Sequence, residues 1–192
     1  MVTKKYKVFV IGLNKTGTTS LGLALSMLGY NLCPESKLYQ KTHFEKINDG
    51  DFSILDKFIL KYNAFQDRPW NHPKVYQYID KNYDNCKFIL TLRDSQKWIE
   101  SYKKWNNKVR LNRQSYYKTV SKICYGIEDF LSDESVMLNT FNSWAAEIIE
   151  YFKNKDNLLL FDFVKSDNWG EICSFLNENT PNKTFPHANK TN

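Results

Sequence analysis

Short apolar runs alternate along the chain with longer stretches in which apolar residues recur every three or four positions. Four of the short runs predict β-strands, at residues 6–12, 63–66, 87–92 and 157–163, of which the second is the weakest. Their apolarity is continuous rather than alternating, which is typical of strands covered on both faces. The pattern therefore favours a parallel sheet.

The longer stretches predict amphipathic helices at residues 18–29, 51–62, 95–105, 134–153 and 168–178. Strands that alternate with helices indicate parallel crossover connections. We predict an α/β fold, a three-layer sandwich whose central, mostly parallel sheet of about four to five strands is flanked by helices, similar to P-loop NTPases. In such folds, ligands bind beyond the carboxyl ends of the strands.

Length and composition favour a single domain. The chain has 192 residues, enough for one well-filled core, and residues 181–192 are expected to form a C-terminal tail. No apolar segment is long enough for a leader or a membrane span, so we expect a cytoplasmic protein that does not enter a membrane. The four cysteines lack metal-ligand spacing, and we expect free thiols and no metal site.

The formal net charge of +6 favours anionic partners in general. Nucleic acid, phosphorylated cofactors, acidic substrates and anionic lipids all fit this charge. The net charge alone therefore does not distinguish these classes of partner.

Candidate chemistry begins at residues 12–20, GLNKTGTTS, where the first strand passes into the first helix. Backbone N–H groups are unpaired at such a junction and the helix dipole is positive there, so an anion is favoured. Gly12 and Gly17 allow tight turning and close approach of the backbone. The loop also supplies hydroxyl donors and one mobile cation: Thr16, Thr18, Thr19, Ser20 and Lys15. We predict a phosphate-binding loop.

This loop departs from the Walker template G-x-x-x-x-G-K-[ST]. Gly12 and Gly17 match its glycine spacing, but Thr18 stands at the lysine position. A magnesium-dependent nucleotide kinase or NTPase is weakened by this difference and stays open as an alternative, with Asp162 as a candidate metal ligand. A non-catalytic nucleotide-binding or RNA-binding module is the other alternative.

A second motif follows the third strand. Arg93 lies at the strand's carboxyl end, and Ser101 comes eight residues later, about two turns into the next helix. A strand-end arginine and a helix-face serine can converge on one further phosphate, with the guanidinium supplying a fork of charge-assisted hydrogen bonds.

Together the two motifs resemble those of sulfotransferases that use 3′-phosphoadenosine-5′-phosphosulfate (PAPS). In that family a K-x-G-T-T-[ST] loop holds the 5′-phosphosulfate and an R-[ND]-x₆-S unit holds the 3′-phosphate; here they are KTGTTS (residues 15–20) and RDSQKWIES (93–101). Residues 64–70, AFQDRPW, are similar to the family's second-strand segment, and residues 168–189 to the ending of its small branch. The basic C-terminal motif of the cytosolic branch is absent, and Lys183 and Lys190 are candidates to replace it.

The resemblance implies metal-independent, in-line transfer of a sulfuryl group from PAPS to a hydroxyl or amine, which gives PAP. It makes Lys15 the candidate that neutralises the leaving oxygen. The other cofactor-binding residues that it implies are Thr16, Gly17, Thr18, Thr19 and Ser20 around the 5′-phosphate, and Arg93 and Ser101 at the 3′-phosphate.

An acceptor hydroxyl or amine also needs a base. Asp67 is the first candidate, because it matches an acidic residue that acts as base, or positions the acceptor, in several branches of the family. The competing interpretation is a structural turn before Pro69. His72 is the second candidate, while His43, within QKTHF, echoes a K-T-H tripeptide of the cytosolic branch but lies too early in the chain.

The acceptor is expected to be a small molecule or a glycan, and a protein side chain stays open as an alternative. No nucleic acid is expected as partner, and the sequence does not indicate the oligomeric state. The basic and aromatic run at residues 103–122 has three interpretations: a solvated helix face, an RNA-contacting patch, or a lid over an anionic acceptor. We prefer a lid or substrate loop, because the run directly follows the Arg93–Ser101 unit.

Overall fold

The computed structural model describes residues 4–34, 40–109, 120–124, 126, 133–164 and 168–188. Its centre is a four-stranded sheet in the order β2-β1-β3-β4, and all three strand pairings are parallel. The strands are β1 (Lys7–Val10), β2 (Ala64–Gln66), β3 (Cys86–Leu92) and β4 (Leu158–Asp162). All four predicted strands are therefore confirmed, including the weakest.

The helices are α1 (Thr18–Met27), α2 (Lys41–Asn48), α3 (Ser53–Lys61), α4 (Pro73–Asn82), α5 (Ser95–Val109), α7 (Glu134–Phe152) and α8 (Asn168–Leu176), and residues 120–124 are helical too. The five predicted helices are confirmed, whereas α2 and α4 were missed. Prolines at positions 69 and 73 made the start of α4 resemble a turn. In the structure Pro73 occupies the first turn of α4, where a missing N–H costs nothing.

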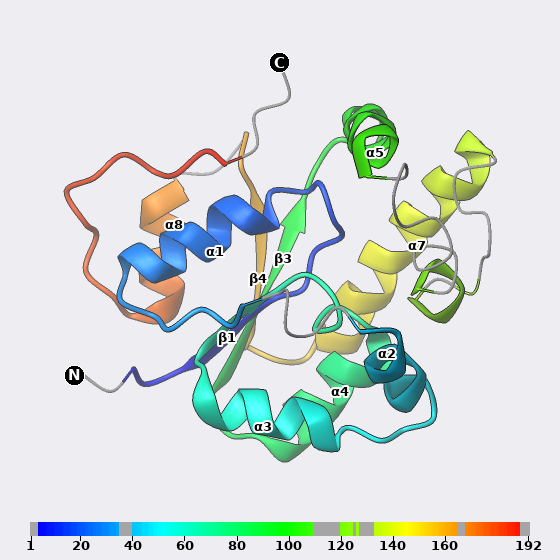
Figure 1. The fold of residues 1–192 in the computed structure, drawn as a ribbon. Coiled ribbons are helices and arrows are strands. Elements are labelled where there is room, and N and C mark those ends of the chain that lie inside the picture. The colour runs from blue at the N-terminus through cyan, green and yellow to red at the C-terminus, as the bar shows by residue number, and fades with distance from the viewer. Residues whose placement is uncertain are drawn as a thin grey trace.

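Helices cover both faces of the sheet, which confirms the predicted three-layer sandwich (Figure 1). On one face, α1 and α8 pack against Val8 and Val10 of β1. On the other face, Phe9 belongs to a larger core formed with α3, α4, α5 and α7. Within that core its ring stacks on Phe65 of β2, with the ring centroids 4.5 Å apart. Alternate residues of the central strand β1 are thus buried on opposite faces.

The strand order creates a switch point between β1 and β3. The chain leaves β1 toward β2 on one side and leaves β3 toward β4 on the other. In open parallel sheets, a crevice forms beyond the carboxyl ends of the two strands at such a point. The predicted phosphate-binding loop follows β1, and Arg93 follows β3. Both therefore lie at this crevice.

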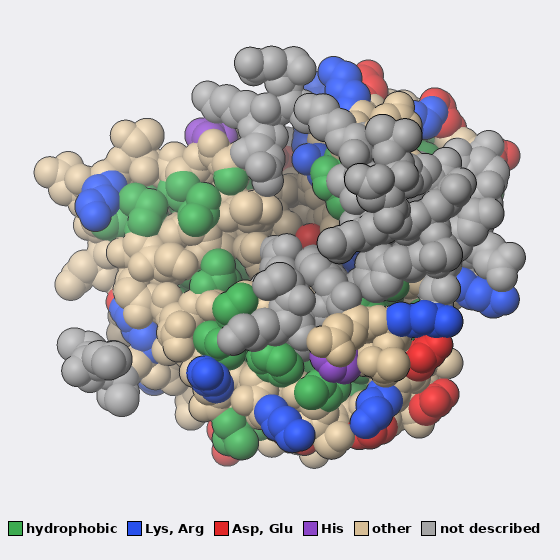
Figure 2. All heavy atoms as spheres, in the orientation of Figure 1, with side chains coloured by type: hydrophobic (Ala, Val, Ile, Leu, Met, Phe, Trp, Pro, Cys, Tyr) green, Lys and Arg blue, Asp and Glu red, His purple; other side chains and the backbone are tan. Residues whose placement is uncertain are grey.

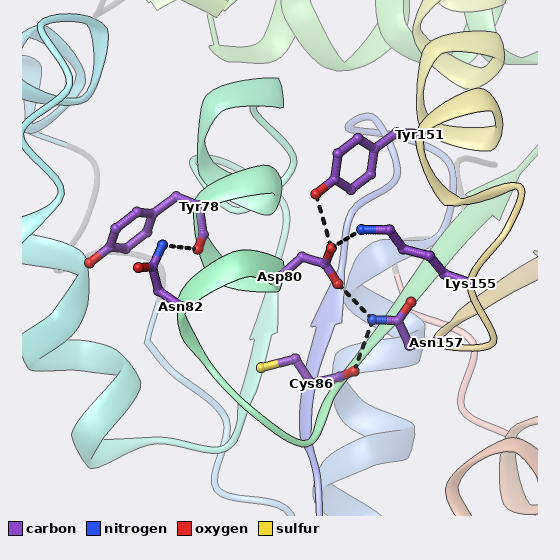
Figure 3. A network of polar contacts seen from close by, with 7 residues as sticks. All are labelled: Tyr78, Asp80, Asn82, Cys86, Tyr151, Lys155 and Asn157. Carbon is purple, nitrogen blue, oxygen red and sulfur yellow. Dashed lines mark hydrogen bonds and ion pairs between the residues drawn. The ribbon is translucent and has the colours of Figure 1, made fainter.

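A polar network ties elements together at the opposite edge of the sheet (Figure 3). The carboxylate of Asp80, on α4, accepts hydrogen bonds from Tyr151 at 2.9 Å and Asn157 at 2.8 Å, and pairs with Lys155. Burial alone would raise the pKa of the Asp80 carboxyl, but the bonds from Lys155, Asn157 and Tyr151 together lower it. The network joins the end of α4 to the connection between α7 and β4.

Three further expectations concern side chains and surface. All four cysteines are buried free thiols in the structure. Among the described residues, no helix combines the length and apolarity needed to cross a membrane. Within the same residues, no group of three or more His, Cys, Asp or Glu side chains is placed to hold a metal ion.

Candidate active site

The loop between β1 and α1 turns sharply and leaves a helix end open. Lys15 has a φ of 72° and Gly17 a φ of 101°. Helix α1 then begins at Thr18 with Gly17 as its N-cap, and no described side chain caps it. The first-turn N–H groups have no intrahelical partner, so they point out of the helix with the positive end of its dipole. This arrangement favours an anion at the loop.

Two glycines allow the loop to lie against its neighbours. A Cβ at Gly12 would come within 1.8 Å of the Thr91 hydroxyl oxygen on β3. A Cβ at Gly17 would come within 2.3 Å of the Phe163 ring, just after β4. Glycine is therefore required at position 12 by close packing alone, and at position 17 by both packing and backbone conformation.

The loop hydroxyls differ in what they can offer a ligand. Thr16 is buried, and its hydroxyl donates to the Leu13 carbonyl at 2.6 Å and contacts the Thr91 hydroxyl at 2.5 Å. Since a hydroxyl has one proton, Thr16 braces the loop and keeps no side-chain proton for a phosphate. Thr18 and Ser20 are buried in the first turn of α1, and Thr19 is half-buried there.

The loop is held from the side by β3 and α5. Arg93 donates from Nη1 to the Lys15 carbonyl at 2.8 Å, and Trp98 donates from Nε1 to the Asn14 carbonyl at 2.8 Å. The two predicted phosphate motifs are therefore in direct contact. The guanidinium carries five N–H donors, of which the Lys15 carbonyl takes one.

Several buried polar atoms in the two predicted phosphate motifs and after β2 have no hydrogen-bond partner within the described part of the chain. They are Ser101 Oγ on α5, Asn14 Oδ1 in the loop and Asn71 Oδ1 after β2. Ser101 is 4% exposed. Buried polar atoms are nearly always hydrogen-bonded in folded proteins, so unpaired ones indicate a bound molecule or water.

Asp67 lies at the carboxyl end of β2, beside the loop. It is buried, has a left-handed φ of 62°, and its Oδ1 accepts the Arg68 N–H at 2.8 Å. Four residues later, Asn71 Nδ2 donates to the Gly12 carbonyl at 2.9 Å and so ties this segment to the loop. Sequence reasoning missed Asn71, although its spacing from Asp67 within a Pro-containing turn was a possible signal.

His72 caps α4 rather than standing open in the crevice. Its Nδ1 accepts the Lys74 N–H at 3.2 Å, so the ring proton is on Nε2, which lies 3.4 Å from the Ile123 carbonyl. Burial lowers the pKa of His72, with a small opposing effect from the Ile123 carbonyl. The neutral imidazole uses both nitrogens within the protein. His43 lies on α2, and His187 is exposed in the tail.

Cys124, which was not a sequence candidate, and three residues that were candidates complete the description of this region. Burial raises the pKa of the Cys124 thiol to about 11, so this thiol stays protonated beside Arg68. Asp162 ends β4 and its Oδ1 accepts the Val164 N–H at 3.0 Å, as in a turn. Lys183 is exposed in the tail. Lys190 and half of the basic run, residues 110–119, lie outside the described residues.

The surface on this side is hollowed (Figure 2). An acidic side chain is visible at the floor of the hollow, and a basic side chain lies beside it.

Comparisons with known proteins agree on one family. Residues 7–192 match the family described as "Sulfotransferase domain". The chain is 25% identical over 221 residues to the "Ava biosynthesis cluster protein M" of Aspergillus versicolor, covering 94% of this chain and 80% of that protein. A crystal structure of a sulfotransferase from Alicyclobacillus acidocaldarius has the same fold, with a TM-score of 0.62 at 15% identity over 99% of this chain and 87% of that one. Because the family match spans almost the whole chain, this protein belongs to the sulfotransferase family.

Proposed function

We propose that this sulfotransferase takes its sulfuryl group from PAPS and transfers it to a hydroxyl or amine, releasing PAP. One observation carries the proposal: Arg93 Nη1 lies 2.8 Å from the Lys15 carbonyl, so the two phosphate motifs form one continuous surface. A nucleotide with a phosphate at each end needs such a surface.

The residues present fit such a donor. One anion fits the open N-terminus of α1, where Thr18 and Thr19 add hydroxyls to the backbone N–H groups. A second fits the remaining N–H groups of Arg93 together with Ser101 Oγ, which is buried without a described partner. Both positions lie at the switch point of the sheet, where α/β folds bind nucleotides.

In the proposed mechanism the donor supplies a sulfuryl group already joined to a phosphate leaving group. Lys15, at the turn of the loop, stabilises the negative charge that develops on the leaving oxygen. Asp67, on the neighbouring strand end, accepts the proton of the acceptor hydroxyl or amine. Asn71 helps to fix the position of Asp67 relative to Lys15, because it joins the Asp67 segment to the loop at Gly12.

Calorimetry with PAP in the absence of Mg²⁺ tests the donor assignment. We expect wild-type protein to bind PAP, and Arg93→Ala and Ser101→Ala each to weaken binding by about tenfold or more, since each loses charge-assisted hydrogen bonds. Lys97→Ala and Ser26→Ala are matched controls on α5 and α1, and both should bind as wild type does. Unchanged affinity in both site variants would overturn the 3′-phosphate assignment.

A transfer assay tests the reaction itself. PAPS with a labelled sulfonate, offered with small alcohols, amines and glycans, should label at least one of these acceptors without added metal. Magnesium-dependent ATP or GTP hydrolysis with no PAP binding would contradict the proposal and favour a nucleotide kinase or NTPase. Tight, salt-sensitive RNA binding that PAP does not compete with would contradict it as well.

A further inference from the structure

The C-terminal tail returns to the phosphate-binding loop from the far end of the chain. The backbone N–H of Ala188 donates to Ser20 Oγ at 2.9 Å, across 168 positions of sequence. Ser20 lies in the first turn of α1 and is 5% exposed. The last described residue of the tail therefore donates a hydrogen bond to a residue of the predicted phosphate-binding loop.

Aromatic packing anchors this tail. Phe185 is buried, and its ring lies edge-on to Trp169 of α8 at 4.8 Å and to Phe163 at 5.9 Å between centroids. Trp169 Nε1 also donates to the Lys183 carbonyl at 2.7 Å. Phe163 is the ring that Gly17 packs against, so one aromatic cluster supports both the tail and the loop.

The hydrogen bond from the Ala188 N–H determines whether the Ser20 hydroxyl acts as a donor or as an acceptor toward a ligand. A hydroxyl has one proton and two lone pairs. The Ala188 N–H occupies a lone pair, and no described residue accepts the hydroxyl proton. The Ser20 hydroxyl is therefore prepared to donate, beside the open N–H groups at the start of α1.

We propose that the C-terminal tail is a positioning element of the donor site: Phe185 anchors it, and the Ala188 N–H orients the Ser20 hydroxyl to donate its proton to a phosphate oxygen of the donor. This inference rests on the proposed function, since it assigns one more contact to the same nucleotide. It gives the tail a role that its sequence, without a basic cofactor motif, does not indicate.

A double-mutant cycle tests this role, with the dissociation constant of PAP as the readout. Ala188→Pro removes the N–H, Ala188→Gly keeps it, and Ser20→Ala removes the hydroxyl. We expect Ser20→Ala to weaken PAP binding about tenfold, Ala188→Pro about three- to tenfold, and Ala188→Gly not at all. Because the tail acts through the hydroxyl, the double variant should bind as weakly as Ser20→Ala and no more weakly.

Proline at position 188 could distort the backbone of the tail, so a second variant without proline is needed as a check. Phe185→Ala releases the anchor and substitutes no loop residue, so it should weaken PAP binding in the wild-type background and have no further effect in Ser20→Ala. Wild-type affinity in Ala188→Pro, or multiplicative losses in the double variants, would overturn the role of the tail while leaving the proposed function standing. Failure of wild-type protein to bind PAP would overturn both.

Discussion

Lys15 carries a side chain in a left-handed backbone conformation, with a φ of 72°. Such a conformation costs about 1–3 kcal/mol for a residue other than glycine, and it persists only where surrounding contacts impose it. Here the contacts come from Arg93, at the Lys15 carbonyl, and from Trp98, at the Asn14 carbonyl. Strain of this kind is often found at functional sites.

Replacing Lys15 with alanine tests this cation. Alanine meets the same backbone strain as lysine, so the fold should persist. We expect the rate of PAP formation from PAPS to fall by about 100- to 1,000-fold, because the developing charge loses its cation. Rates are measured with the best acceptor of the screen, and Lys97→Ala, an exposed lysine on α5, is the control. Turnover close to wild type in Lys15→Ala would contradict the role.

His72 predicts a dependence of stability on pH. Burial lowers its folded pKa below the ordinary value of 6.5, so below pH 6.5 the unfolded chain takes up a proton that the folded protein resists. The stabilisation is complete above pH 6.5 and is lost as the pH falls through the folded pKa.

Urea unfolding at several pH values between 7 and 5 measures this effect. His72→Asn keeps a side-chain acceptor for the cap of α4 and has no titrating group. We expect the variant to lose less stability than wild type as the pH falls. Parallel curves for the two proteins would show that His72 does not titrate in this way.

At the scale of elements, the turn between β1 and α1 depends on how closely its neighbours approach. Phe163, which follows β4, fills the space that a Cβ at Gly17 would need, and Thr91 of β3 does the same at Gly12. The conformation of the predicted phosphate-binding loop thus depends on side chains from β3 and from the segment after β4, as well as on its own residues. Elements distant in sequence set the geometry of a nine-residue motif, GLNKTGTTS.

Gly17→Ala separates packing from backbone strain when it is compared with Gly50→Ala. Both glycines have positive φ values, 101° and 85°, but a Cβ at Gly50 meets nothing within 4 Å. We expect Gly50→Ala to lose about 1 kcal/mol of stability, and Gly17→Ala to lose about 1–3 kcal/mol more and to bind PAP poorly. Equal losses in chemical denaturation would show that the Phe163 contact is unimportant.

The Asp80 network predicts a loss of stability far from the site (Figure 3). Asp80→Asn removes the charge that Lys155, Asn157 and Tyr151 share, and we expect a loss of about 1–2 kcal/mol near pH 7 with unchanged PAP affinity. Asp84→Asn, at an exposed carboxylate, is the control.

The sign of the pH effect follows from the lowered pKa of Asp80. Its contribution is present above the ordinary value of 3.8 and is lost as the pH falls through the folded pKa, so wild type and Asp80→Asn should converge in acid. A difference that stays constant down to that range would mean that the charge of Asp80 is not responsible.

At the scale of the whole molecule, the donor would bridge elements from both halves of the chain. Loop residues 12–20 precede β2, whereas Arg93 and Ser101 follow it, and the tail contact at Ala188 comes from beyond α8. A ligand held by segments this far apart in sequence stabilises the folded state as a whole.

PAP at about 100 times its dissociation constant should therefore add about 2.7 kcal/mol to the free energy of unfolding. For a chain of this size, that corresponds to a rise in Tm of about 5–10 °C. Scanning calorimetry with and without PAP, and with and without Mg²⁺, measures it. A rise that requires Mg²⁺ would argue against metal-independent binding.

The sequence alone determined the strands, five of the helices and the layer arrangement, and it predicted the two phosphate motifs. These follow from local periodicity and from groups whose chemistry is set by the few residues around them. Helices α2 and α4 were missed, although α4 has ten residues and is as long as α1.

Tertiary structure alone decided how the groups at the site are used. The hydroxyl of Thr16 is taken up by the Leu13 carbonyl, both nitrogens of His72 serve the protein, and Asn71 joins two loops. The contact between Ala188 and Ser20 could not be read from sequence either. Hydrogen-bond partners are chosen by proximity in space, and the folded chain brings together groups that local pattern leaves independent.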